Sequence, residues 1–131
     1  STDSTEELAD NYIKEYPNRI KYIKEPRQGV HFARNSAAKI ADGEILYFTD
    51  DDMIADRNLL SEIVKVFELD SKIASVTGRV LPKWEVNPPE WILKLCYNEL
   101  LSLNDPQEDL IVSSKDCNVY SCHQAILRHV F

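Results

Sequence analysis

Residues 44–52 of the chain are Glu-Ile-Leu-Tyr-Phe-Thr-Asp-Asp-Asp, an apolar run that ends in three consecutive carboxylates. The run is apolar at successive positions, as is typical of a central strand that is covered by helices on both faces. Because side chains alternate along a strand, Asp50 and Asp52 are expected to point to one side and Asp51 to the other. The first and third carboxylates of the triplet can then share one metal-bound ligand.

The chemistry of the triplet favours a cation. Adjacent carboxylates repel one another, and their hard oxygens suit Mg²⁺ or Mn²⁺, which one or two carboxylates usually bind together with substrate phosphates. The alternative is a solvated acidic turn that caps the helix starting near Arg57, because acidic residues are favoured at helix starts. The triplet alone leaves both interpretations open.

Outward from this strand, the pattern alternates between strands and helices. It predicts a helix at 5–16, a strand at 19–24, a helix at 30–41, the strand at 44–49, a helix from about 57, and a strand at 73–81. The β-α-β-α-β order from residue 19 onward implies right-handed crossovers and a largely parallel sheet. Ligands bind such sheets at the carboxyl ends of the strands, where residues 26–29 and 50–52 are expected to lie.

The helix predicted at 30–41 carries a second candidate group near its start. Its amino terminus offers free N–H groups to an anion, and Arg34 adds a forked donor for phosphate. The alternative for Arg34 is a salt bridge to a nearby aspartate. His31 is adjacent to the same loop, where a diphosphate contact competes with the interpretation as an ordinary surface histidine.

Beyond residue 81 the pattern becomes irregular, and a proline-rich loop carries Trp84 and Trp91. Aromatic faces stack on the apolar faces of sugar rings, so Trp84 is a candidate for substrate contact. The alternative is that both tryptophans pack the loop onto the sheet. Residues 117–122 are predicted as a final strand, and residues 124–131 as the beginning of a helix.

Composition limits the possible functions. The 131 residues fit one domain, and 15 basic against 22 acidic residues give a net charge of -7. This charge argues against a nucleic-acid surface and against general attraction to anionic lipid. No apolar stretch is long enough to span a membrane and no signal peptide is apparent. Three cysteines without C-x-x-C spacing predict reduced thiols, so a cytoplasmic protein is expected.

Several motifs at their observed spacing resemble family 2 glycosyltransferases of the GT-A fold. They are Gln28-Gly29-Val30, Ala33-Arg34-Asn35, Ala41-Asp42-Gly43-Glu44, Asp50-Asp51-Asp52 and, more weakly, the tail 118–127. The resemblance implies an incomplete, mostly parallel, Rossmann-like sheet flanked by helices, without the family's first strand and C-terminal region. Residues 1–131 would be one partial domain, with the nucleotide-diphosphate and metal-binding part at 1–81 and the acceptor side at 82–131.

The resemblance also implies a function. A sugar would pass with inversion from a nucleotide-diphosphate sugar donor to a saccharide or lipid-linked acceptor, in a protein for polysaccharide biosynthesis. Asp52 would bind Mg²⁺ or Mn²⁺ directly, and Asp50 would face the ribose or the waters of the metal. Substrate contacts are assigned to Gly29, Arg34, Asp50, Asp51 and Trp84.

The resemblance places the general base in a segment after Phe131, so no catalytic residue is expected within the chain. The chain alone is then expected to be inactive, as a piece of a longer protein whose remaining parts can also associate with a membrane. Candidates for a base inside the chain are Glu99, Glu108 and Asp109. Two rival functions stay open, a non-catalytic nucleotide or metal-binding module and a nucleotidyltransferase-like domain.

Overall fold

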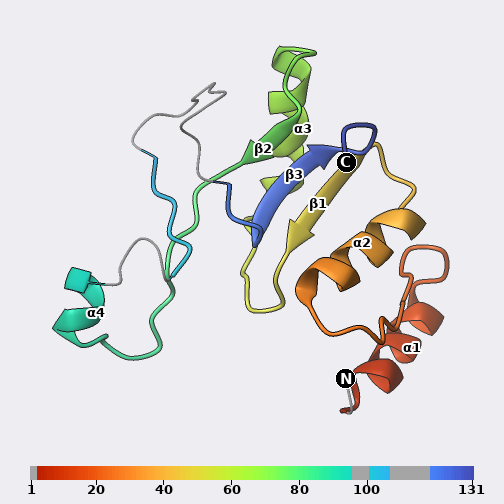
Figure 1. Cartoon of the computed structure of the whole chain (residues 1–131), viewed down its shortest axis with the longest axis horizontal. Helices are drawn as coiled ribbons and strands as arrows, with labels where there is room; N and C mark the ends of the chain where they lie inside the picture. Colours follow the sequence, from red (N-terminus) through yellow and green to blue (C-terminus); the bar gives the residue numbers. More distant parts are fainter. Residues whose placement is uncertain (1–2, 96–100, 107–118) are drawn as a thin grey trace. The chain divides into compact units, whose positions relative to one another are not determined.

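The computed structural model describes residues 3–95, 101–106 and 119–131. The chain forms two compact units, Ser1–Asp42 and Gly43–Phe131. The first unit contains the helices α1 (Thr5–Glu15) and α2 (Val30–Ile40). The second contains β1 (Ile45–Thr49), α3 (Leu59–Leu69), β2 (Ser75–Thr77), α4 (Glu90–Leu95) and β3 (His123–Leu127), as Figure 1 shows. The functional division predicted at residue 81 stays a prediction.

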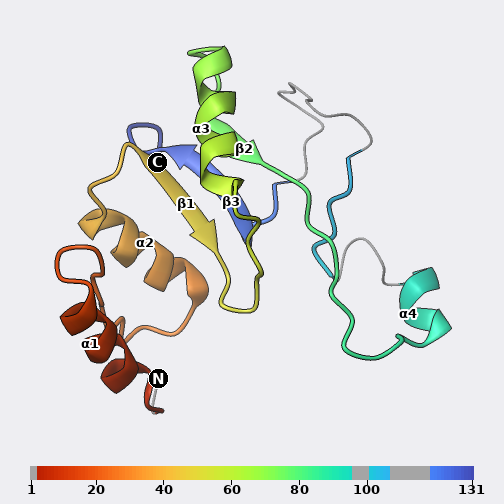
Figure 2. The same cartoon turned by 180° about the vertical axis from the view of Figure 1, so that it is seen from behind.

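The second unit is built on a three-stranded sheet in the order β1-β3-β2. In the register, Ala125 at the middle of β3 lies opposite Tyr47 of β1 and Val76 of β2. Ala125 has no exposed surface, and Leu46 of β1 and Ile63 of α3 are each 6% exposed. Helix α3 covers one face of the sheet, as seen from behind in Figure 2. The apolar run from which the fold was predicted therefore forms an edge strand of the three-stranded sheet.

The expectation of a mostly parallel sheet is wrong for the strands that the structure describes. Both β1 and β2 pair with β3, and both pairs are antiparallel. Since each runs opposite to β3, β1 and β2 run parallel to each other, as the crossover through α3 requires. They do not pair, because β3 occupies the place between them. The fold is α/β, and the order of the strands was not apparent from local pattern.

The end of the chain also differs from the prediction. Residues 124–131 were expected to begin a helix, whereas His123–Leu127 form β3 and a turn follows at 128–130. The predicted strand 117–122 lies partly outside the described residues, and residues 119–122 form no strand. The tertiary reason is that β3 makes backbone ladders on both of its edges, which outweighs the local helical preference of a short apolar segment.

In the first unit, the predicted strand 19–24 is absent, since residues 20–26 are neither helix nor strand. Side chains hold this segment instead of a strand ladder. Nζ of Lys21 donates to the carbonyl oxygen of Ile40 at 2.8 Å and also contacts Asp42. Nζ of Lys24 pairs with Glu6 at 2.6 Å. A lysine at the last carbonyls of a helix stabilises the helix end. Lys21 therefore stabilises the end of α2 and at the same time attaches the segment 20–26 to it.

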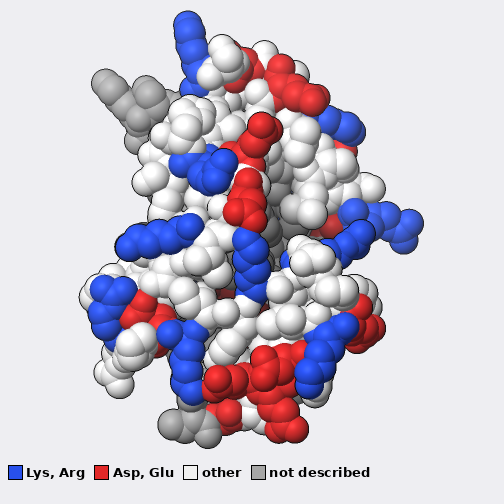
Figure 3. Space-filling view, turned by 90° about the vertical axis from the view of Figure 1, so that its right-hand side faces the viewer, with Lys and Arg blue, Asp and Glu red and all other residues white. Residues whose placement is uncertain are grey.

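The surface carries charges of both signs. Figure 3 shows basic and acidic side chains interspersed over much of one face, with a group of acidic side chains clustered at its lower edge. Apolar side chains are also exposed, and the stripe formed by Leu8 and Tyr12 of α1 and its C-cap Tyr16 is 43–57% exposed. Within the described part of the chain, none of the helices has the length and apolar character that crossing a membrane requires.

Candidate functional site

The three aspartates lie where the sequence predicted, directly after a strand. Asp50 follows Thr49, the last residue of β1, and Asp51 and Asp52 form the turn after it. All three are exposed, and the Thr49 hydroxyl donates to the backbone carbonyl of Asp50 at 3.3 Å. The carboxyl end of β1 therefore presents the triplet to solvent, as a site for a soluble ligand requires.

The edge of the sheet beside the triplet is formed by the ends of all three strands. Thr49 of β1 lies opposite His123, the first residue of β3, and Thr77 of β2 lies opposite Gln124. The Thr77 hydroxyl donates to the carbonyl oxygen of His123 at 2.7 Å. The position of β3 thus brings a histidine to the strand end that precedes Asp50, which the sequence analysis did not foresee.

His123 is buried, with 7% exposure. Its Nδ1 shares a hydrogen bond of 2.8 Å with the Tyr47 hydroxyl, and the two rings meet edge to face. Burial lowers the pKa of His123, because a charged imidazolium would lose its hydration, and burial also raises the pKa of Tyr47. His123 is therefore a neutral, hydrogen-bonded part of the sheet next to the aspartates. The signal that could have identified it is its place at the start of a strand with apolar neighbours.

The two ends of the loop that carries the tryptophans lie side by side and are joined by hydrogen bonds. Val80 and Asn104 exchange backbone hydrogen bonds of 2.7 and 3.0 Å, and the Asn104 side chain donates to Gly78 at 2.7 Å. Nε of Arg79 donates to the Asp105 carboxylate at 2.6 Å. These contacts close the loop directly after β2.

The two tryptophans lie between these two anchored ends of the loop. Trp84 is 40% exposed, and Trp91, on α4, is 58% exposed. An exposed indole is available for stacking on a sugar ring. The structure thus leaves Trp84 open to substrate contact, and its role stays a prediction.

The other predicted contacts belong to the first unit. Gly29 is the N-cap of α2 and has a φ of 129°, a backbone conformation that a side chain would strain. Gly29 accepts hydrogen bonds from the backbone N–H groups of Phe32 and Ala33. Arg34 lies in the second turn of α2. The structure describes Gly29 and Arg34 in one unit and the aspartates in the other.

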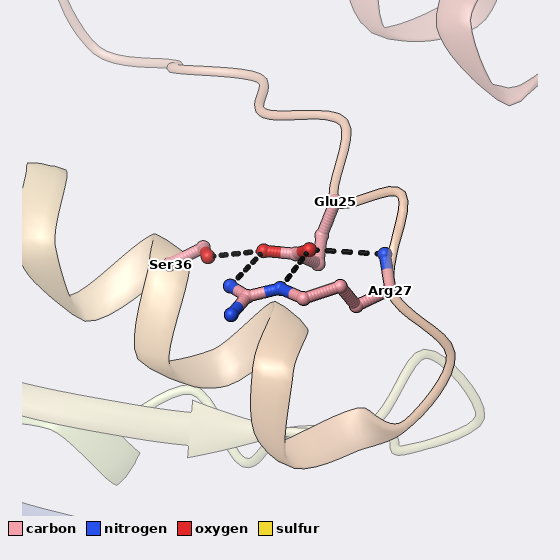
Figure 4. Close-up of polar contacts among 3 residues, drawn as sticks. All are labelled: Glu25, Arg27 and Ser36. Atoms are coloured by element: carbon pink, nitrogen blue, oxygen red, sulfur yellow. Dashed lines mark hydrogen bonds and ion pairs between the residues drawn. The ribbon is translucent and has the colours of Figure 1, made fainter.

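Glu25, which the sequence analysis passed over, organises the loop before α2, as Figure 4 shows. Its Oε1 accepts from Nε of Arg27 at 2.7 Å and from the Arg27 backbone N–H at 3.0 Å. Its Oε2 accepts from Nη2 of Arg27 at 2.8 Å and from the Ser36 hydroxyl at 2.6 Å. These four contacts, which we call the Glu25 clasp, tie the loop to the middle of α2.

The clasp is partly shielded from water, and its hydrogen bonds favour the ionised form of the Glu25 carboxylate. The Glu25 side chain is 8% exposed, and Ser36 is also 8% exposed. The hydrogen bond from the Arg27 side chain, followed by that from Ser36, holds the pKa of Glu25 far below its ordinary value. The guanidinium also lies over the ring of Phe32, 4.5 Å from its centroid. An open cavity beside the clasp is lined by residues 24–28.

Most of the remaining candidate groups lie outside the described residues. Glu99, Glu108 and Asp109, the candidates for a base inside the chain, lie outside the described residues, as do Cys96 and Cys117. Cys122 is buried. Over residues 3–95, 101–106 and 119–131, no three side chains of His, Cys, Asp or Glu gather closely enough to hold a metal ion by themselves.

A comparison with models of protein families shows to which family the chain belongs. The model of glycosyl transferase family 2 matches residues 1–131, the whole chain. The chain belongs to glycosyl transferase family 2. Family membership agrees with the resemblance in the motifs at residues 28–35 and 41–52. No solved structure is significantly similar to this family 2 chain.

Three curated relatives of the family 2 chain are glycosyltransferases by name. A glucosyl-dolichyl phosphate glucuronosyltransferase of Haloferax volcanii is 24% identical over 72 residues, which are 55% of this chain and 23% of the relative. The uncharacterized glycosyltransferase YfnE of Bacillus subtilis is 33% identical over 73 residues, 56% of this chain and 18% of the relative. The O-antigen chain rhamnosyltransferase WbaN of Salmonella anatum is 32% identical over 90 residues, 67% of this chain and 27% of the relative. The matched segments therefore span about a quarter or less of these relatives.

Proposed function

We propose that the chain is the donor-binding part of a glycosyltransferase with a GT-A fold. The protein would transfer a sugar from a nucleotide-diphosphate sugar to a hydroxyl group of a saccharide or lipid-linked acceptor. Membership of glycosyl transferase family 2 supports this proposal. The names of two relatives also support it, since one acts on a dolichyl phosphate conjugate and the other on the O-antigen chain.

The observation that carries the proposal is the exposed carboxylate triplet at the carboxyl end of β1. Its donor set fits Mg²⁺ or Mn²⁺, because these ions prefer carboxylate oxygens and complete their shells with phosphate and water. Asp52 would hold the metal, Asp50 would contact the ribose or the metal's waters, and Asp51 would contact the donor.

The chemistry follows from the leaving group. Departure of a nucleoside diphosphate builds negative charge on its phosphate oxygens, and a bound divalent metal would supply the Lewis acid that neutralises this charge. Gly29 and Arg34 would bind the nucleotide, and Trp84 would contact a sugar ring. Inversion requires a general base for the acceptor hydroxyl, which we place beyond Phe131.

Calorimetric titration of the full-length protein with UDP, GDP, dTDP and ADP tests this proposal. We expect at least one nucleotide to bind in the presence of Mn²⁺ and to bind much more weakly with EDTA. Asp52→Asn should weaken Mn²⁺-dependent binding by at least about 10- to 100-fold, because loss of even an outer-shell partner of a metal ligand has an effect of this size. Asp10→Asn, an exposed position on α1, is the matched control.

Two results would overturn the proposal. The first is the absence of metal-dependent binding of any of these nucleotides to the wild-type protein, which favours a module without transferase function. The second is an Asp52→Asn variant that binds nucleotide and Mn²⁺ as tightly as Asp10→Asn does, because the triplet would then be only an acidic turn. Sugar transfer by the isolated chain at the rate of the full-length protein would overturn the placement of the base.

A further inference from the structure

The Glu25 carboxylate uses its hydrogen-bonding capacity within the protein. Each oxygen of the Glu25 carboxylate accepts two hydrogen bonds. Of these four bonds, Arg27 donates three and Ser36 donates one. The Arg27 guanidinium is at the same time held over the Phe32 ring. Neither Glu25 nor this edge of the guanidinium is therefore available to a ligand, so the clasp must act through the geometry that it fixes.

The clasp contacts one face of α2. Phe32 and Ser36 are four residues apart and lie on the same side of the helix, toward Arg27 and Glu25. Arg34 is two residues from each of them, which in an α-helix is a rotation of about 200°. Contacts that fix Phe32 and Ser36 toward the loop therefore also fix the direction in which Arg34 leaves the helix, which is roughly opposite to the clasp.

The clasp also sets the path of the chain into α2. The Arg27 backbone N–H is bound by the same carboxylate that binds Ser36, and only Gln28 and Gly29 separate Arg27 from the helix. Gly29 then takes its φ of 129°. One partly shielded carboxylate thus ties down both the loop and the rotation of the helix, without a side-chain cap on α2.

We propose that Glu25 is a positioning residue for nucleotide binding, which fixes the direction of Arg34 through Arg27 and Ser36. This inference rests on the proposed function, because it needs Arg34 to contact the nucleotide. The alternative role of Glu25 is stability of the first unit alone. The two roles differ in one respect, since a positioning residue changes nucleotide affinity in a protein that remains folded, and only while Arg34 is present.

The test compares nucleotide affinities in the full-length protein by calorimetry, with Mn²⁺ fixed and UDP, GDP, dTDP and ADP as probes. Glu25→Gln keeps the side-chain volume but removes the charge, and Ser36→Ala removes only the contact to α2. Both should weaken nucleotide binding about 2- to 30-fold, the range for residues that act on a site through their neighbours. Glu6→Gln, which breaks the exposed ion pair with Lys24 in the same unit, should leave affinity unchanged.

A double-mutant cycle with Arg34→Ala separates positioning from stability. If Glu25 acts through Arg34, Glu25→Gln should cause little further loss of affinity in the Arg34→Ala protein, because coupled residues are not additive. Full additivity, or wild-type affinity in folded Glu25→Gln and Ser36→Ala proteins, would overturn the inference while leaving the proposed function intact. Should Glu25→Gln fail to fold, Ser36→Ala decides alone. Absence of nucleotide binding by the wild-type protein would overturn the proposed function and this inference with it.

Discussion

Nε2 of His123 lies 2.5 Å from the position that a Cβ atom on residue 78 would occupy. Gly78 directly follows β2, and His123 begins β3, so the absence of a side chain at residue 78 gives the imidazole its place. The ring cannot easily turn aside, because Nδ1 is bonded to the Tyr47 hydroxyl. The sheet edge beside the aspartate triplet thus depends on one glycine and one histidine together.

Replacing this glycine should disturb the sheet edge. Gly78→Ala is expected to lower the free energy of unfolding by about 1–3 kcal/mol, the usual cost of overpacking, because the methyl group displaces the His123 ring. Urea unfolding of the full-length protein measures this loss. In the cycle with His123→Ala, the Gly78→Ala change should cost much less, since the clash is absent. An equal cost in both backgrounds would contradict the contact.

The bond between Tyr47 and His123 predicts a second effect. Tyr47→Phe removes the hydroxyl and leaves the buried Nδ1 of His123 without this partner, which should cost about 1–3 kcal/mol of unfolding free energy. Tyr12→Phe is the matched control, because Tyr12 is 48% exposed and its hydroxyl can bond to water instead. Equal unfolding free energies for the two variants would show that the Tyr47 hydroxyl makes no useful bond.

Burial of His123 also predicts a dependence of stability on pH. The pKa of His123 is lower in the folded chain than its ordinary value of 6.5, so the unfolded chain binds more protons below neutral pH. This contribution to stability should be complete above about pH 7 and should decline as the pH falls below 6.5. Urea unfolding between pH 5 and 8 measures the slope.

A matched pair of variants assigns this slope to its residue. His123→Gln should flatten the decline below pH 6.5, because the group that takes up the proton is gone. His129→Gln, at an exposed position in the turn after β3, should keep the decline. A His123→Gln protein that loses stability on acidification as steeply as the wild type would show that other groups cause the effect.

The loop before α2 gives a prediction for Gly29. Gly29→Ala places a Cβ 2.6 Å from Cε1 of His31 and requires a φ of 129°, which alanine rarely adopts. The two effects together should lower the unfolding free energy by about 1–3 kcal/mol. In the Gly29→Ala, His31→Ala double variant only the steric part is relieved, so stability should recover partially in urea unfolding. Complete recovery would mean that the backbone at residue 29 is not strained.

Local pattern was sufficient for α2, α3 and β1. The helices predicted at 30–41 and from about residue 57 correspond to α2 and α3, and the strand predicted at 44–49 is confirmed as β1. In each of them the apolar spacing within a dozen residues specifies one structure. The position of the aspartates directly after a strand followed from the same pattern. These elements could be predicted because neighbouring residues determine them.

Long-range pairing explains what the pattern missed. The segment His-Gln-Ala-Ile-Leu at 123–127 fits a helix as well as a strand, and only its ladders with β1 and β2 select the strand. Residues 19–24 alternate as a strand does, yet they have no ladder partner among the described residues. A strand is defined by its partner, which lies far away in sequence.

The Glu25 clasp was missed for a related reason. Glu25 and Arg27 look like two ordinary surface charges in a loop of mixed sign. Their importance appears only when Ser36, eleven residues later, turns toward them from α2. A serine in a helix gives no sequence signal of such a contact, because serines in helices commonly face water.

The insertion of β3 between β1 and β2 has a consequence for how the chain folds. Within the part of the chain that the structure describes, neither β1, which ends at Thr49, nor β2, which ends at Thr77, has a strand partner until residues 123–127 have been made. During synthesis, the backbone hydrogen-bonding groups of β1 and β2 therefore stay unpaired with β3 while the intervening chain emerges. Closing a loop of this length is entropically costly and slow. We expect the second unit to fold only after the ribosome has released β3, which makes the nascent chain dependent on protection from aggregation during that interval.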